Sequence, residues 1–174
     1  MTPDMQLSTH FSLYELTVTS NAALQEKNRE LTMEQTQKLA TLALHCEAIR
    51  EICGGHAVKI HSGYRSAALN GATLGSSKTS QHPLCEAVDL DVPGQSVEET
   101  FGDLLTAARA GRFKFGQLIL EYAQREYGAV KWVHCSVAGS LPPEKVGQVL
   151  KMVAGVDGKP KYELLDRLTF KENV

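Results

Sequence analysis

Residues 80–91 read SQHPLCEAVDLD, and this stretch decides the fold. Its second half alternates apolar and polar residues, which is the period of a β-strand, so Asp89 projects from one strand face. His82 precedes that strand in a turn, and His134 follows far downstream in the strand-like run WVH at residues 132–134. The sequence therefore presents two imidazoles and one carboxylate from a sheet and its turns.

Two imidazoles and one carboxylate are a ligand set that suits a catalytic metal. Zinc in hydrolases takes three nitrogen or oxygen ligands from the protein and keeps a fourth position for water, whereas structural zinc closes its shell with four ligands, usually several cysteines. We therefore predict an open zinc site formed by His82, Asp89 and His134.

The four cysteines offer a competing kind of metal site. They are Cys46, Cys53, Cys85 and Cys135, and none of them forms the closely spaced pair that is typical of a zinc knot. Without a secretory signal they are most simply free, mostly buried thiols rather than disulfides. Cys135 should also face the opposite side of its strand from His134, which argues against a zinc site that includes it.

Composition limits the classes of protein that fit. The 174-residue chain is 43% hydrophobic and 22% charged, and we expect one domain over residues 1–155, a peripheral tail over residues 156–174, and a monomer. A net charge of −2 without a basic cluster argues against a nucleic-acid partner, and no apolar run reaches the ~18 residues needed for membrane insertion. The N-terminal segment has no basic stretch followed by an apolar run, so we expect synthesis in the cytoplasm without a signal peptide.

Capping and periodicity signals predict an α+β fold. Capping boxes at Thr32–Gln35 and Ser96–Glu99 begin two amphipathic helices. Alternating runs predict four strands, at residues 58–61, 87–92, 117–123 and 130–137. A last short helix is expected from Pro142 through Val153. These elements predict a small antiparallel sheet with helices packed on one face and an open-shelled zinc site on the sheet.

The last two strands form a hairpin with an expected turn at Tyr127-Gly128. If the hairpin is symmetric about that turn, Glu121 faces His134 and projects beside the proposed ligand. Glu121 is then the candidate general base, which takes a proton from the attacking water. Alternatively, it hydrogen-bonds a ligand histidine or is an exposed strand residue. The other candidate carboxylates are Glu86, Asp91 and Glu126.

Five short motifs resemble those of one known family. They are HFSLYEL at residues 10–16, SGYRS at 62–66, SQH at 80–82, AVDLD at 87–91 and WVH at 132–134. In this order and spacing they look like the zinc D-alanyl-D-alanine carboxypeptidase family, whose relatives include vancomycin-resistance dipeptidases and phage endolysin peptidases. The resemblance covers roughly residues 7–137, and the opening motif is similar to that of the phage-type branch.

The resemblance also implies roles for individual residues. It implies that His82, Asp89 and His134 bind zinc. It implies that Arg65, a planar bidentate donor, holds a substrate carboxylate, and either Arg65 or a nearby polar group would steady the charge that develops in the reaction. The expected substrate contacts beside Arg65 are Ser62, Tyr64, Ser80 and Gln81.

Two positions depart from the family pattern. Cys85 stands where the family has glycine, a residue that often marks a left-handed or closely approached backbone, so an altered turn is expected there. Lys131 stands three residues before His134, where the vancomycin-resistance relatives place an acidic base. The base must then come from elsewhere, and Glu121 is the first candidate.

The sequence as a whole predicts a zinc peptidase that acts on peptidoglycan stem peptides, at the D-Ala-D-Ala end or at an internal bond. The phage-like opening and the missing signal favour a phage or prophage lysis enzyme that another protein releases to the cell wall, or a component carried in a phage particle. One alternative is a catalytically impaired, zinc-containing binding module, comparable to the related hedgehog signalling domains. Another is a cytosolic dipeptidase or resistance enzyme.

Overall fold

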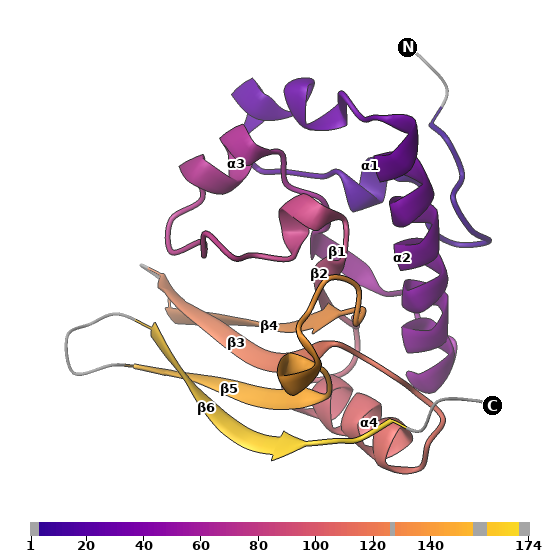
Figure 1. Cartoon of the computed structure of the whole chain (residues 1–174), viewed down its shortest axis with the longest axis vertical. Helices are drawn as coiled ribbons and strands as arrows, with labels where there is room; N and C mark the ends of the chain where they lie inside the picture. The colour runs from indigo at the N-terminus through magenta and orange to yellow at the C-terminus, as the bar shows by residue number, and fades with distance from the viewer. Residues whose placement is uncertain (1–3, 126–127, 155–159, 171–174) are drawn as a thin grey trace.

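The computed structural model describes residues 4–125, 128–154 and 160–170 (Figure 1). In these ranges the chain forms one sheet of six strands in the order β1-β2-β4-β3-β5-β6. The strands are β1 (Lys59–Ser62), β2 (Ala87–Asp91), β3 (Gln117–Arg125), β4 (Gly128–Ser136), β5 (Gln148–Ala154) and β6 (Pro160–Arg167). The α-helices are α1 (Leu13–Leu16), α2 (Met33–Ile52), α3 (Ala67–Ala72) and α4 (Val97–Arg109). Short 3₁₀ turns are η1 (Ala22–Leu24), η2 (Lys27–Arg29), η3 (His82–Leu84) and η4 (Pro143–Lys145).

The predicted α+β class is confirmed by these helices and strands. None of the described helices has the length and apolar character needed to cross a bilayer.

The two long helices, α2 and α4, build the core on one face of the sheet (Figure 1). Both begin with the predicted capping boxes, in which the hydroxyls of Thr32 and Ser96 each accept a hydrogen bond from a backbone N–H of the first turn. The core residues of these helices include Leu39, Leu42, Ile49 and Leu104, and those of the strands include Val88, Leu90, Leu118, Val133 and Val149. Because strand side chains alternate, the residues between these apolar positions face the other side of the sheet.

The C-terminal part of the sheet differs from the prediction. The helix expected through Val153 is wrong, because residues 148–154 form β5, which pairs in parallel with β3. Residues 160–167, expected in a peripheral tail, form the edge strand β6 and pair antiparallel with β5. Val149 is fully buried in the core while Leu150 faces the opposite side, so burial in the sheet outweighed the helix-start signal of Pro142. The sheet is therefore mixed and larger than expected.

The β3–β4 hairpin has the predicted face but a different register. Glu121 pairs with Trp132, and His134 pairs with Ile119 instead of Glu121. The observed pairing differs from the expected one by two residues, because Gly128, expected in the turn, is already the first residue of β4. Tyr127, the other residue of the expected turn, lies outside the described residues. Since strand side chains alternate with a period of two, Glu121 keeps the same face as His134.

Candidate metal centre and active site

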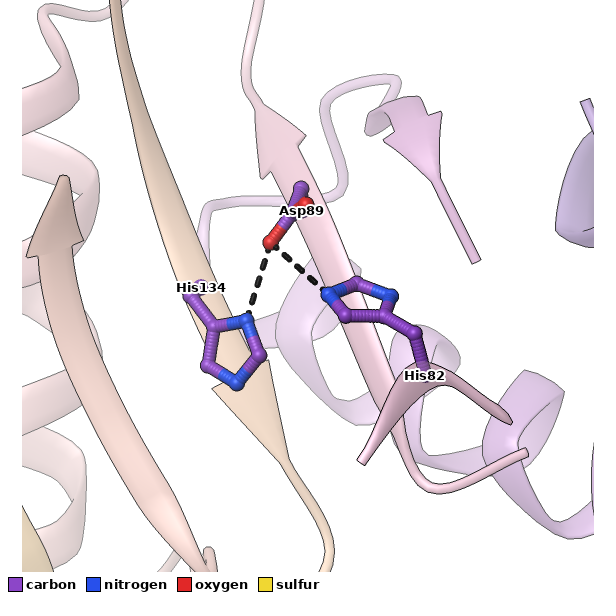
Figure 2. A group of neighbouring side chains, drawn as sticks. All are labelled: His82, Asp89 and His134. Atoms are coloured by element: carbon purple, nitrogen blue, oxygen red, sulfur yellow. Dashed lines mark hydrogen bonds and ion pairs between the residues drawn. The ribbon is translucent and has the colours of Figure 1, made fainter. Parts of the chain in front are cut away.

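The side chains of the three predicted ligands, His82, Asp89 and His134, lie together (Figure 2). One ligand atom of each residue lies within 4.8 Å of the other two. Asp89 Oδ1 lies 2.9 Å from His134 Nδ1 and 3.3 Å from His82 Nε2. The turn η3 and the strands β2 and β4 thus bring three donor atoms to one point.

Strand alternation explains why Asp89 and His134 face each other. The two residues are directly paired across β2 and β4. The neighbours of His134, Val133 and Cys135, are fully buried on the core face. Cys135 therefore points away from the ligands, as predicted, and all four cysteines are buried and free.

His82 reaches the site from a turn that ends in a left-handed residue. The turn η3 ends at Cys85, with φ 61° and ψ 33°, and the backbone N–H groups of Cys85 and Glu86 donate to the carbonyls of His82 and Gln81. The sequence predicts an altered turn at Cys85, yet this residue adopts the left-handed backbone that glycine favours. A side chain in that conformation costs about 1–2 kcal/mol.

The ring of His82 is oriented by the arginine motif. Its Nδ1 lies 2.6 Å from the carbonyl oxygen of Gly63, which can only accept a hydrogen bond. Nδ1 therefore carries the proton, and Nε2 presents a lone pair toward Asp89. A Cβ on Gly63 would overlap the backbone of Leu16, so a glycine is needed at this position. The N-terminal motif and the arginine motif thus pack together to orient a ligand.

The donor set fits a zinc ion. His82 Nε2 is buried and has no hydrogen-bond partner in the part of the chain that the structure describes. An unprotonated Nε2 that faces a carboxylate oxygen at 3.3 Å is stabilised by a cation between them. Two imidazole nitrogens and one carboxylate oxygen are the mixed ligands of catalytic zinc. These three residues are the one group of this kind among the described residues.

Burial and mutual contact shift the protonation of all three residues. Burial lowers the pKa of His82 by more than Asp89 raises it. Burial also acts to lower the pKa of His134, but its hydrogen bond to Asp89 and the charge of that carboxylate raise the pKa overall. Burial acts to raise the pKa of Asp89, yet the two imidazoles hold that pKa well below its usual range. Asp89 is therefore an anion at neutral pH, as a metal ligand must be.

Arg65 lies next to this cluster on a loop held by a buried amide. The guanidinium Nη2 is 3.9 Å from Asp89 Oδ2. Asn28 is fully buried, and its Nδ2 donates to the carbonyls of Thr17 and Tyr64 at 2.9 and 3.0 Å. Its Oδ1 accepts a hydrogen bond from the backbone N–H of Ser66 at 2.7 Å. Asn28 thus fixes both sides of the arginine, and no motif in the sequence pointed to it.

A cavity of about 850 Å³ joins these groups. The predicted site residues that line it are Ser62, Arg65, Ser80, Gln81, His82, Asp89, Glu121 and His134. Tyr64, expected to contact substrate, does not line it: its ring is buried in the core and its hydroxyl accepts a hydrogen bond from Gln35 Nε2 at 3.1 Å. The structure therefore brings together all the predicted site residues except Tyr64.

Glu121 is the candidate base that the cavity geometry favours. Among the described residues that line the cavity, Asp89 and Glu121 are the only carboxylates. Burial raises the pKa of Glu121, the charge of His134 lowers it, Asp89 raises it again, and the net shift is upward. A carboxylate whose pKa is raised is a stronger base near neutral pH.

The other candidate carboxylates do not line the cavity and have partners of their own, or are not described. Glu86 accepts hydrogen bonds from the backbone N–H and the hydroxyl of Ser140, at 3.0 and 2.8 Å. Asp91 Oδ2 lies 2.9 Å from His61 Nε2. Glu126 lies outside the described residues. The role of Glu121 stays a prediction, but its strongest rivals have other partners.

Lys131 shows why the position three residues before His134 does not supply a base in this chain. In β4 an odd spacing places two residues on opposite faces, so Lys131 faces α4, where its ammonium contacts the Glu98 carboxylate. An acidic residue at position 131 of this strand would therefore also face away from the ligands.

Tyr162 is the site residue that the sequence reasoning missed. It lies on β6 and lines the cavity, and its hydroxyl donates to Glu121 Oε1 at 3.2 Å. A signal existed: the dipeptide Asp157-Gly158 is typical of a hairpin turn, and the alternating run after it is typical of a strand. The tail expected beyond residue 155 leaves no place for this strand.

The comparison with protein families agrees with this geometry. A family model described as Peptidase M15 matches residues 9–136, which contain β1 to β4, the three candidate ligands, Arg65 and Glu121. No curated protein sequence matches the chain. The matched part ends before β5 and β6, so the hairpin that carries Tyr162 lies outside it.

Proposed function

The chain belongs to the peptidase M15 family, whose members are zinc-dependent peptidases, and we propose that it hydrolyses peptide bonds in the stem peptides of peptidoglycan. One observation carries the proposal: a cavity lined by the zinc-type trio of His82, Asp89 and His134 also contains one further carboxylate, Glu121, and the half-buried guanidinium of Arg65. A metallopeptidase needs these parts within reach of one scissile bond.

His82, Asp89 and His134 would hold the zinc ion. When bound, zinc supplies Lewis acidity that polarises the scissile carbonyl and makes a water molecule more acidic. Glu121 accepts a proton from that water as its oxygen attacks the carbonyl carbon. Glu121 then returns the proton to the amine nitrogen as the C–N bond breaks.

Arg65 supplies a fixed positive charge beside the candidate metal site. Burial lowers its pKa, while the neighbouring Asp89 and Glu121 carboxylates raise it, and a guanidinium stays charged at neutral pH in either case. Its buried Nε has no hydrogen-bond partner in the described ranges. A planar donor with an unused N–H suits a substrate carboxylate or the oxygen on which charge develops.

The finer identity rests on the N-terminal motif. Residues 10–16 resemble the opening of the phage-type branch, and the carbonyl of Leu16 in this motif accepts a hydrogen bond from Tyr64 N at 2.7 Å. The motif is therefore tied to the arginine loop. On this basis we propose a role in cell-wall lysis by a phage or prophage.

Purified peptidoglycan provides the direct test. The full chain with zinc should release new muropeptides or D-alanine, a chelator should stop the release, and added zinc should restore it. Mass spectrometry of the products then identifies the cleaved bond, and free D-Ala-D-Ala tests the dipeptidase alternative. Binding to the wall without any cleavage would contradict the proposal and support the binding-module alternative.

A further inference from the structure

The β5–β6 hairpin forms a wall of the cavity although it lies outside the part of the chain that matches the family. Its lining residues are Gln148, Leu150, Met152, Val153, Pro160 and Tyr162. Leu150 continues the row of paired residues that contains His134 and Ile119, because β5 lies beside β3 in the sheet. The hairpin is thus part of the same surface as the candidate metal site.

Tyr162 is the residue of this hairpin that reaches the reactive groups. It pairs with Met152 across β5 and β6, and its hydroxyl donates to Glu121 Oε1 at 3.2 Å. Burial raises the pKa of the Tyr162 phenol, and the charge of Glu121 raises it further. The hydroxyl therefore remains protonated at neutral pH and acts as a donor.

We propose that Tyr162 is a positioning residue that holds Glu121 for proton transfer. Its hydrogen bond occupies one carboxylate oxygen, Oε1, and leaves the other oxygen of Glu121 to accept the proton from the attacking water. The carboxylate would otherwise rotate among several orientations, and a restrained base reacts more often from the productive one. This inference rests on the proposed function, since it assigns Glu121 the role of base.

The contact also sets the protonation of Glu121. The charged groups that face Glu121 are His134, Asp89 and Arg65, and Tyr162 adds a neutral donor. A donor to a carboxylate stabilises the charged form, so its removal raises the pKa of that carboxyl. Loss of the Tyr162 hydroxyl should therefore raise the pKa of Glu121.

The test compares Tyr162→Phe with Tyr14→Phe in the purified, zinc-loaded full chain. Tyr14 is an exposed tyrosine on α1 whose ring lies 4.5 Å from the Arg29 guanidinium, so its variant removes a hydroxyl elsewhere. Tyr162→Phe should lower kcat roughly tenfold, the effect of one hydrogen bond to a charged group, with little change in KM. The acidic limb of its pH–rate profile should move to higher pH. Tyr14→Phe should change none of these values, and the melting temperature should match the parent in both variants.

A second measurement does not depend on turnover. The ¹³C resonance of the Glu121 carboxyl, followed against pH, should give a higher pKa in Tyr162→Phe than in the parent and in Tyr14→Phe. An unchanged pKa, or an unchanged kcat despite a raised pKa, would overturn the inference while leaving the proposed function intact. If the parent chain cleaves no peptide, the proposed function fails, and the same resonance still decides whether Tyr162 holds Glu121.

Discussion

Histidines pack against both faces of the sheet, but they do so in opposite ways. On the helix face, His45 stacks on Phe113 with ring centroids 4.9 Å apart, and its Nε2 lies 3.4 Å from Cys135 Sγ. On the cavity face, His82 and His134 lie on either side of the Asp89 carboxylate (Figure 2). Adjacent residues of β4, His134 and Cys135, belong to the two different faces.

The difference shows what turns a buried imidazole into a metal ligand. On the helix face, burial lowers the pKa of His45 to about 4 and raises the pKa of the Cys135 thiol. Both groups are therefore neutral, and a neutral thiol is a poor zinc ligand. On the cavity face, a carboxylate that stays ionised gives two imidazoles a common partner. Burial alone makes a structural histidine, whereas burial beside an anion in a cavity makes a binding site.

Removal of a metal ligand should have the largest effect on the difference between the two faces, because the candidate zinc site lies on the cavity face. His82→Ala, Asp89→Ala and His134→Ala should each lose zinc and activity, whereas Cys135→Ala on the other face of the same strand should keep its zinc. The loss in zinc affinity should exceed the roughly 10- to 100-fold cost of changing a residue that only hydrogen-bonds a ligand. The fold should persist because the apolar core does not depend on the ion. Metal analysis after dialysis measures this, and full occupancy in the three ligand variants would contradict the assignment.

Glu121→Gln should affect activity without affecting metal. An amide has nearly the shape of the carboxylate but cannot take up the proton, so kcat should fall about 100-fold or more. Zinc content should not change, because Glu121 is not a ligand. Glu98→Gln, a matched change of an exposed carboxylate on the helix face, should leave kcat unchanged. A fall in zinc affinity for Glu121→Gln would instead mean that Glu121 supports a ligand.

Arg65→Lys should affect substrates according to their charge. A lysine keeps the charge but loses the bidentate fork, so kcat/KM should fall roughly tenfold more on stem peptides with a free terminal carboxylate than on amidated ones. Arg109→Lys, which changes an exposed arginine paired with Asp166, is the control and should not discriminate. Equal losses on both substrates for Arg65→Lys would make Arg65 a packing residue.

Most residues of the cavity face were predictable because they lie within short sequence motifs. Asp89 and His134 follow from strand alternation, and the two-residue error in the hairpin register did not move Glu121 to the other face. The rest depended on contacts that are distant in sequence. The sequence predicts a helix where β5 lies, because the partner of β5, β3, is about thirty residues away and pairs in parallel. Asn28 fixes a loop that follows it by 36 residues, and no local pattern marks such a contact.

The pH dependence of stability tests whether His45, unlike the histidines of the cavity face, is held neutral by burial. Its folded pKa of about 4 lies below the ordinary 6.5, so between these values the unfolded chain binds a proton that the folded chain does not. Stability is therefore complete above pH 6.5 and falls as the pH drops toward 4. Because the ring is partly exposed, we expect a contribution of about 2 kcal/mol rather than the full effect of the shift.

Urea unfolding at pH 7.5 and pH 4.5 tests this expectation. His45→Gln should lose about 2 kcal/mol less than the parent between the two values, with unchanged zinc content at pH 7.5. Other acid-sensitive groups are the same in both proteins and cancel in the difference. An identical pH dependence in parent and variant would show that the imidazole of His45 is not held neutral by burial.

Cys85 ends the turn η3 that carries His82, and its replacement should show the smallest effect. The residue is 1% exposed and has φ 61°, so Cys85→Ala and Cys85→Gly both remove a buried thiol, but only alanine keeps a Cβ in the left-handed backbone. In the middle of a helix or strand, a glycine variant is less stable than an alanine variant by roughly 0.5–1 kcal/mol. Here the order should reverse, with Cys85→Gly more stable by about 1 kcal/mol in urea unfolding, because the left-handed strain is relieved. Zinc content and kcat should stay within about twofold of the parent in both variants, since the turn still delivers His82. If alanine proves the more stable replacement, the left-handed backbone at position 85 carries no strain that glycine relieves.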